Sequence, residues 1–175
     1  MSTTLEHVPT GTYTLDTVHS SIGFGVKYNI GTFRTTFEKV DAQLAGGVLT
    51  GTAKASSIQI DQPQFKQHLV GEEFFNVEVT PDVVFRSTDI RPAADGGVEV
   101  DGELTIRGVT KPVTATGTYS AGPDAFGNNR VGFELETTVD RREFGLNWQN
   151  PLPNGSDSLA WRVVVSVDLQ LVEES

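Results

Sequence analysis

Strict alternation of apolar and polar residues is the feature that most constrains the fold of this chain. In its last long segment every second side chain is apolar: Trp161, Val163, Val165, Val167, Leu169 and Leu171. A period of two places these side chains on one face of a β-strand and the intervening residues on the other. The pattern recurs over residues 22–29, 98–107, 113–120 and 131–140. It predicts an all-β protein whose C-terminal half is a meander of antiparallel hairpins.

Further strands are predicted in the N-terminal half. We expect them over residues 12–17 and 49–60, at a segment marked by Phe33 and Phe37, and around Val83 and Phe85. Many short strands separated by turn residues favour a sandwich or a barrel. The alternation alone does not choose between these two architectures.

One segment departs from the alternation and predicts a short helix. Asp61 is suited to the N-cap, and Pro63 follows early enough to be tolerated in a first turn. Phe65 and Leu69 lie four residues apart, and Gly71 comes next, as at a helix end. We therefore expect a short helix between the early strands and the C-terminal meander.

The charge and the cysteine content exclude several classes of function. The 175 residues include 13 Lys and Arg against 23 Asp and Glu, a formal net charge of −10, and no cysteine. This charge opposes binding to a phosphate backbone, so nucleic acid is not an expected partner. It also predicts that any association with anionic lipid surfaces is transient and weak. The missing cysteine excludes disulfides and thiolate chemistry.

The N-terminal residues bear on localisation. Residues 1–7 have neither the basic segment nor the apolar run of a secretory signal, and no stretch reaches the length of a transmembrane helix. The sequence as written therefore predicts a cytoplasmic protein without stable membrane insertion.

Residues that commonly carry catalysis or bind metals are sparse and scattered. The histidines His7, His19 and His68 lack the spacing of metal ligands, so neither a metal nor another cofactor is expected. His19, beside Ser20 and Ser21, could serve as a base, but a structural histidine at a strand end is favoured. No nucleophile elbow, phosphate-binding loop or dinucleotide motif occurs. The sequence predicts no catalytic residue.

A set of short motifs resembles one known family. The most specific is Gly102-Glu103-Leu104-Thr105-Ile106-Arg107-Gly108-Val109-Thr110-Lys111-Pro112-Val113. Others are His19-Ser20-Ser21, Phe24-Gly25-Val26, Gly31-Thr32-Phe33, His68-Leu69, Glu73-Phe74-Phe75, Phe85-Arg86-Ser87 and Glu143-Phe144-Gly145-Leu146. Together they resemble the YceI-like family, the bacterial polyisoprenoid-binding proteins. The resemblance runs from about Gly11 to Leu171, which implies a single domain over residues 11–172 after a mobile segment, 1–10.

The resemblance implies a fold and a ligand class. The fold is an extended lipocalin-like one, an eight-stranded antiparallel barrel with a helix, enclosing an elongated apolar channel for isoprenoid lipids or quinones. The chain departs from the family in two respects. Many members carry a secretion signal that is not seen here, and Lys66 stands where an acidic residue is expected before His68-Leu69.

The candidate ligand-binding residues are mainly the aromatic side chains of the predicted strands. On their own, such side chains are typical of a simple core, and the resemblance turns them into a predicted channel wall. The set is Phe24, Val26, Tyr28, Phe33, Phe37, Leu69, Phe74, Phe75, Phe85, Leu104, Phe133, Leu135, Trp148 and Trp161. Contacts to a polar head group are assigned to His19, His68 and Arg141.

Small residues on the inward faces leave two interpretations open. Gly102 and Gly117 stand in register with large apolar positions, and Gly51, Ala53, Ala55 and Ser57 follow one face of the predicted long strand. They either leave room for a ligand or mark bends of the barrel.

Three functions follow from these observations. The first is non-enzymatic binding, carriage or sequestration of a long apolar amphiphile such as a polyisoprenoid or an isoprenoid quinone. The second is a hydrolase or other enzyme that acts on a lipid-like substrate with His19. The third is a packed structural or interaction barrel without a ligand. A homodimer is compatible with each of them, because an open strand edge or barrel mouth can be covered that way.

Overall fold

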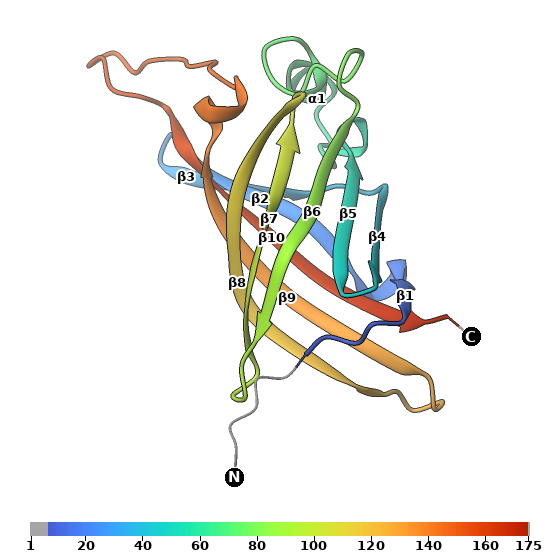
Figure 1. Ribbon diagram of the computed structural model, residues 1–175. Helices are drawn as coiled ribbons and strands as arrows, with labels where there is room; N and C mark the ends of the chain where they lie inside the picture. The colour runs from blue at the N-terminus through green and yellow to red at the C-terminus, as the bar shows by residue number, and fades with distance from the viewer. Residues whose placement is uncertain (1–6, 175) are drawn as a thin grey trace.

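The chain forms one antiparallel sheet of ten strands, shown in Figure 1. The computed structural model describes residues 7–174. The strands are β1 (Thr12–Leu15), β2 (Ser21–Tyr28), β3 (Gly31–Thr36), β4 (Val40–Ala45), β5 (Val48–Lys54), β6 (Asp82–Pro92), β7 (Gly97–Ile106), β8 (Val109–Pro123), β9 (Asn129–Asp140) and β10 (Leu159–Glu173).

The sheet closes into a barrel. Its order is β1-β4-β5-β6-β7-β8-β9-β10-β2-β3, and β1 also pairs with β10, which closes a ring of eight strands. β2 and β3 extend the sheet beyond β10. The predicted eight-stranded antiparallel barrel with a short helix is confirmed, with two additional strands.

The predicted helix is α1 (Pro63–Val70), and it begins one residue later than expected. The N-cap is Gln62 instead of Asp61, because the Gln62 side chain accepts a hydrogen bond from the backbone N–H of Phe65. Pro63 occupies the first helical position and Gly71 is the C-cap, as the sequence predicts.

The long strand predicted over residues 49–60 is wrong. β5 ends at Lys54 and a short 3-10 helix, η2 (Ala55–Ser57), follows. Ser57 is the physical reason, since its hydroxyl donates to the Lys54 carbonyl at 2.6 Å and accepts from the Lys39 N–H at 2.9 Å. These local bonds replace the strand ladder. Residues 40–45, to which the sequence analysis assigned no element, form β4.

One edge of β10 changes partner along its length. From Leu159 to Asp168 it pairs with β2, and from Leu171 to Glu173 it pairs with β1. The barrel is therefore closed by β1 at one end and extended by the β2–β3 hairpin at the other. Phe37, which directly follows β3, forms an isolated bridge with Ile58, which directly follows η2.

This change of partner divides the molecule into two halves. The β1 half comprises residues 7–22, 41–51, 85–102, 115–137 and 166–174. The hairpin half comprises residues 23–40, 52–84, 103–114 and 138–165.

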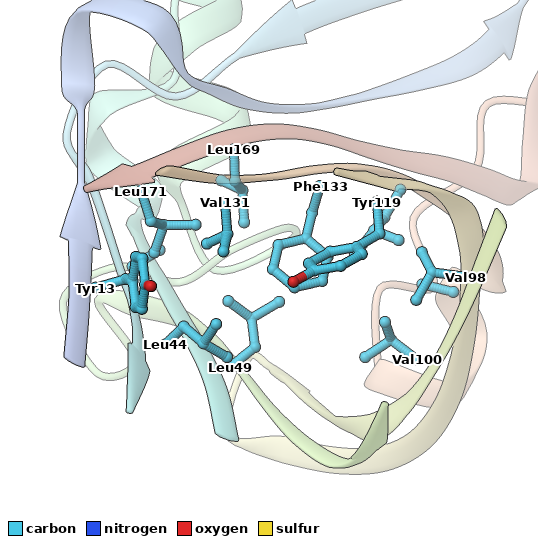
Figure 2. Packing of buried hydrophobic residues seen from close by; sticks show 13 residues of the cluster. Tyr13, Leu44, Leu49, Val98, Val100, Tyr119, Val131, Phe133, Leu169 and Leu171 are labelled. Atoms are coloured by element: carbon cyan, nitrogen blue, oxygen red, sulfur yellow. The ribbon is translucent and has the colours of Figure 1, made fainter. Parts of the chain in front are cut away.

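The β1 half is a filled core, as Figure 2 shows. The rings of Tyr119 and Phe133 lie 5.1 Å apart at its centre, and Phe133 is completely buried. Its other large members are Tyr13, Leu44, Leu49, Val98, Val100, Val131, Leu169 and Leu171. Eight strands give an interior that side chains of this size can fill.

Gly102 and Gly117 mark close approaches and not open space. A Cβ atom at Gly117 would lie 1.7 Å from the carbonyl oxygen of Glu134, and one at Gly102 would lie 2.4 Å from the Phe85 ring. These two glycines therefore do not leave room for a ligand, and each accommodates the close approach of a neighbouring strand.

The predicted mobile segment 1–10 is only partly described. Residues 1–6 lie outside the described residues. Within the remainder, the Thr10 carbonyl accepts a hydrogen bond from Gly46 N–H, and Val8 packs against the core of the β1 half.

Candidate binding cavity

The hairpin half contains a cavity of about 480 Å³ that is not closed off from solvent. This volume lies within the range of small-molecule sites. Strands β2, β3, β6, β7, β9 and β10 form its wall, and α1 and the segments around residues 74 and 146 cover it. The lining residues are Ile22, Gly23, Phe24, Val26, Tyr28, Phe33, Phe37, Gln62, Phe65, His68, Leu69, Phe74, Phe75, Val83, Leu104, Ile106, Val139, Arg141, Phe144, Leu146, Trp148, Leu159, Val163 and Val165.

The wall is almost entirely apolar. Phe24 lies at its centre, with ring centroids of Phe33, Phe37 and Phe75 between 5.9 and 6.2 Å away. Apart from the Tyr28 hydroxyl and the Trp148 indole, the polar side chains are those of Gln62, His68 and Arg141. None of the lining residues is acidic. The site is therefore suited to an apolar body with very few polar contacts.

Aromatic contacts organise the cover of the cavity. The His68 ring from α1 lies edge-on to Phe74 and to Trp148, with 4.9 Å between centroids in each case. Arg107 lies in the two-residue turn between β7 and β8 and donates to the carbonyls of Phe74 and Gly145. One guanidinium thus holds together two segments that cover the cavity.

Arg141 lies in the short 3-10 helix η3 (Arg141–Phe144), and its side chain is committed to the backbone. Its guanidinium donates to the carbonyls of Leu146, Trp148, Leu159 and Ala160 at 2.7 to 3.3 Å. The residue is 4% exposed, and burial lowers the pKa of the guanidinium. Arg141 therefore fixes the segment between η3 and β10. Because most of its N–H groups already donate to these carbonyls, they are not directed at a ligand head group.

The two histidines assigned to a head group lie in different places. His68 lines the cavity, is about one-third exposed, and has Nε2 at 3.6 Å from a Glu73 carboxylate oxygen. His19 lies in the 3-10 helix η1 (Thr17–His19) of the β1 half, 60% exposed, with Nδ1 at 2.8 Å from Asp16 Oδ2. It does not line the cavity, so the structure brings only His68 and Arg141 together there.

Four of the fourteen residues predicted to contact a ligand do not line this cavity. Phe133 is buried in the core of the β1 half, because it lies on the part of β9 that belongs to that half. Phe85 and Leu135 line a smaller void of about 90 Å³. Trp161 lies within an irregularity of the β10–β2 register, between Leu159 and Val163, and under the guanidinium groups of Arg141 and Arg142. The prediction that these four residues line the channel is therefore revised.

The sequence analysis missed twelve residues that line the cavity. Val163 and Val165 belong to the strand whose inward face was identified, and Phe144 and Leu146 belong to a recognised family motif. The predicted set is mainly aromatic and so lacks the aliphatic members, whereas Phe144 lies in a 3-10 helix, where the strand alternation gives no signal. The remainder are Ile22, Gly23, Gln62, Phe65, Val83, Ile106, Val139 and Leu159.

Among residues 7–174, no group of three or more His, Asp or Glu side chains is arranged to hold a metal ion. The same residues include no helix of the length and hydrophobicity needed to span a bilayer.

Comparison with known proteins places the chain among described relatives. Residues 13–171 match the model of the YceI-like domain. A protein of Pseudomonas putida F1 named UPF0312 protein is 31% identical over 126 residues, which cover 70% of this chain and 66% of that relative. A UPF0312 protein of Pseudomonas fluorescens SBW25 is 31% identical over 131 residues, covering 73% of this chain and 68% of the relative. The chain thus spans about two thirds of the length of these relatives.

Solved structures show the same fold. BcnA of Burkholderia cenocepacia matches with a TM-score of 0.75 and 20% identity, covering 89% of this chain and 98% of its own. A domain from Saccharophagus degradans, described as polyisoprenoid binding and implicated in plant cell wall breakdown, matches with a TM-score of 0.69 and 11% identity. That match covers 93% of this chain and 98% of the domain.

Proposed function

The chain belongs to the family of YceI-like domains, and we propose that it binds and carries or sequesters a long apolar molecule in its hairpin half without catalysing a reaction. The observation that carries this proposal is the cavity of about 480 Å³ with its almost wholly apolar wall. Each CH₂ group moved from water into such an environment contributes about 0.8 kcal/mol. A few buried isoprene-sized units therefore suffice for useful affinity, after the cost of ordering the ligand.

A polyisoprenoid or isoprenoid quinone is the ligand class we favour. The Saccharophagus degradans domain, described as polyisoprenoid binding, has the same fold. The polar groups near the cover, chiefly His68 and Gln62, offer one or two hydrogen bonds to a small head group. A ligand with a long apolar body and a compact polar end fits this distribution.

The structure favours binding over the enzyme that uses His19. That histidine is exposed in the β1 half, and a substrate in the cavity would not reach it. The packed barrel without a ligand is also less favoured, because only the β1 half is filled.

The first test is chemical identification of the ligand. The protein is purified without detergent, extracted with organic solvent and analysed by mass spectrometry beside an unrelated protein from the same host. We expect an isoprenoid or similar lipid in near-stoichiometric amount. If both the extract and a refolded sample exposed to isoprenoids are blank, the carrier function is wrong.

A matched pair of variants links binding to the cavity. Val163 lines the cavity, whereas its neighbour Val164 does not and lies on the opposite face of β10. In the Val163→Trp variant the indole occupies space in the cavity. We therefore expect the concentration of isoprenoid alcohol that displaces a fluorescent fatty-acid probe to rise at least tenfold. In the Val164→Trp variant this concentration should change less than twofold. Equal effects in two folded variants would place the ligand elsewhere.

A further inference from the structure

The charges of the described residues are distributed unevenly between the two halves. The hairpin half contains ten basic and ten acidic residues, so its formal net charge is zero. The described part of the β1 half contains three basic and twelve acidic residues, a net charge of −9. Almost all of the excess negative charge therefore lies at the end of the barrel away from the cavity.

Exposed apolar side chains occur in both halves: Val18 and Phe126 in the β1 half, and Val84 and three side chains on loops beside the cavity in the hairpin half. Ile30 is fully exposed in the turn between β2 and β3, two residues after Tyr28 of the cavity wall. Val79 is 72% exposed in the loop that follows Phe75, and Leu152 is 36% exposed in the segment after Trp148. Each side chain lies on a loop that continues from a lining residue.

These loops belong to one end of the molecule. The backbone N–H of Asn29, in the β2–β3 turn, donates to the Ser158 carbonyl at 2.8 Å and so joins this turn to the segment that contains Leu152. In Figure 1 the segment before β10 and the loops beside α1 project from the barrel at the end opposite the β8–β9 turn. The apolar side chains thus surround the covered end of the cavity.

We propose that the hairpin half docks on the surface of a phospholipid bilayer, with Ile30, Val79 and Leu152 inserted among the lipids and the cavity facing them. This inference rests on the proposed function, because a long apolar ligand is stored in, and exchanged with, a bilayer. Shallow insertion of apolar side chains from a neutral surface is the physical basis of such interfacial binding.

The charge distribution selects this orientation. Each net negative charge near an anionic bilayer is repelled by it, and this repulsion fades over a Debye length of about 8 Å. A tilted strand of the length of β9 separates the two ends by about 30 Å. With the hairpin half on the bilayer, the negatively charged β1 half lies beyond the Debye length, so its repulsion from the anionic lipids is screened. The inverted orientation would bring that end against lipids of like charge.

A bilayer fits the exposed side chains better than a protein partner does. A stable protein interface buries about 800 Å² on each side. Three isolated apolar side chains on separate loops do not form a continuous patch of that size. They can insert individually among lipid chains.

The test compares vesicle binding of two aspartate variants. Ile30→Asp places a charge at the proposed rim, and Phe126→Asp places one at the β8–β9 turn of the other half, where Phe126 is 90% exposed. The probes are vesicles of phosphatidylcholine alone and of phosphatidylcholine with phosphatidylglycerol, measured by flotation. We expect both vesicle types to bind the parent protein, Ile30→Asp to weaken binding at least fivefold, and Phe126→Asp to change it less than twofold.

A second readout reports orientation. Both tryptophans, Trp148 and Trp161, lie in the hairpin half, so brominated phospholipids should quench the protein's fluorescence on docking. Failure of the parent protein to bind either vesicle, or equal loss in both variants, would overturn the docking.

The fluorescent fatty-acid probe in solution separates the two proposals. If the parent protein binds the probe but not vesicles, the docking is wrong and the carrier function stands. If it binds neither, the carrier function fails as well. Ile30→Asp should bind the soluble probe as the parent does, since Ile30 does not line the cavity.

Discussion

The two halves of this barrel share most of their strands but differ in how their interiors are filled. In the β1 half, eight strands close tightly around Tyr119, Phe133 and their neighbours. In the hairpin half, a larger set of aromatic side chains faces the interior, and a cavity of about 480 Å³ remains. The number of aromatic residues therefore does not determine whether a barrel is hollow. The strands that complete the wall determine whether a cavity remains.

The halves also differ in what holds them together. The β1 half depends on close apolar packing. The cover of the hairpin half depends on guanidinium groups, with Arg141 bonded to four carbonyls and Arg107 to two. Variants that remove these contacts in one half or the other test this contrast.

Removal of an aromatic ring should cost most in the β1 half. Phe133→Ala leaves a void where no atom of the original ring was exposed, so we expect the free energy of unfolding to fall by about 3–5 kcal/mol. Phe24→Ala should cost clearly less, because its ring already borders a cavity. Urea denaturation of both variants measures the difference. Equal losses would mean that the hairpin half is packed as tightly as the other.

Loss of the Arg141 guanidinium should loosen the cover of the cavity. Arg141→Met retains much of the side-chain volume but leaves four carbonyls without their donor, and we expect a loss of about 2–4 kcal/mol. Hydrogen exchange should accelerate over residues 145–160 and stay slow in β7 and β9 at their β1-half ends. Uniform acceleration across the barrel would contradict a local role.

Phe85 lines the smaller void in the middle of the barrel, which adjoins the cavity. It packs against both cores, and Ile22, Val83, Leu104 and Val165 line both spaces. Phe85→Ala should join them, at a cost in stability of about 3 kcal/mol, the low end for such a truncation, because the ring already borders a void. We expect affinity for longer isoprenoid alcohols to rise relative to shorter ones. An unchanged chain-length preference would show that Phe85 is not the floor of the site.

Acid should weaken the ion pairs of Arg130 in the β1 half, and we expect this to lower the stability less than the substitutions above. Arg130 pairs with Asp16 and Asp124 and lowers the pKa of both carboxyl groups, that of Asp124 to about 2. Because the folded pKa lies below the unfolded value, the stabilisation is present above about pH 4 and is lost as the pH falls toward 2. Arg130→Met should therefore flatten the dependence of unfolding free energy on pH in this window.

Arg86→Met provides the control for the acid prediction. Arg86 is exposed and makes no ion pair with any described residue. Its replacement should leave the pH dependence unchanged. If both variants behave alike, the Arg130 pairs do not stabilise the fold.

The sequence predicts the barrel well because period-two alternation records which face of each strand is buried. It fails at Ser57, where a single hydroxyl ends the ladder, since the same residue type is compatible with a strand. It also gives no sign that β10 changes partner. That change depends on pairing between residues about 150 positions apart, such as Leu15 and Leu171.

The site is predictable only in part for the same reason. Ten of the fourteen residues predicted to contact a ligand line the cavity, and their contact with a ligand stays a prediction. Phe133 and Val163 both follow an inward alternation, and nothing local shows that one faces a filled core and the other a void. The position of each residue along the barrel axis decides this. Its consequence for the cavity is known only once the β2–β3 hairpin has been placed beside β10.

The shared edge of β10 has a consequence for how such a protein can diversify. Because β1 closes the ring independently at residues 13–15, the hairpin of residues 21–36 can lengthen, shorten or change its inward side chains without opening the barrel. Evolution or protein engineering can therefore change the width of the binding site through this hairpin alone, while the other strands of the barrel stay unchanged.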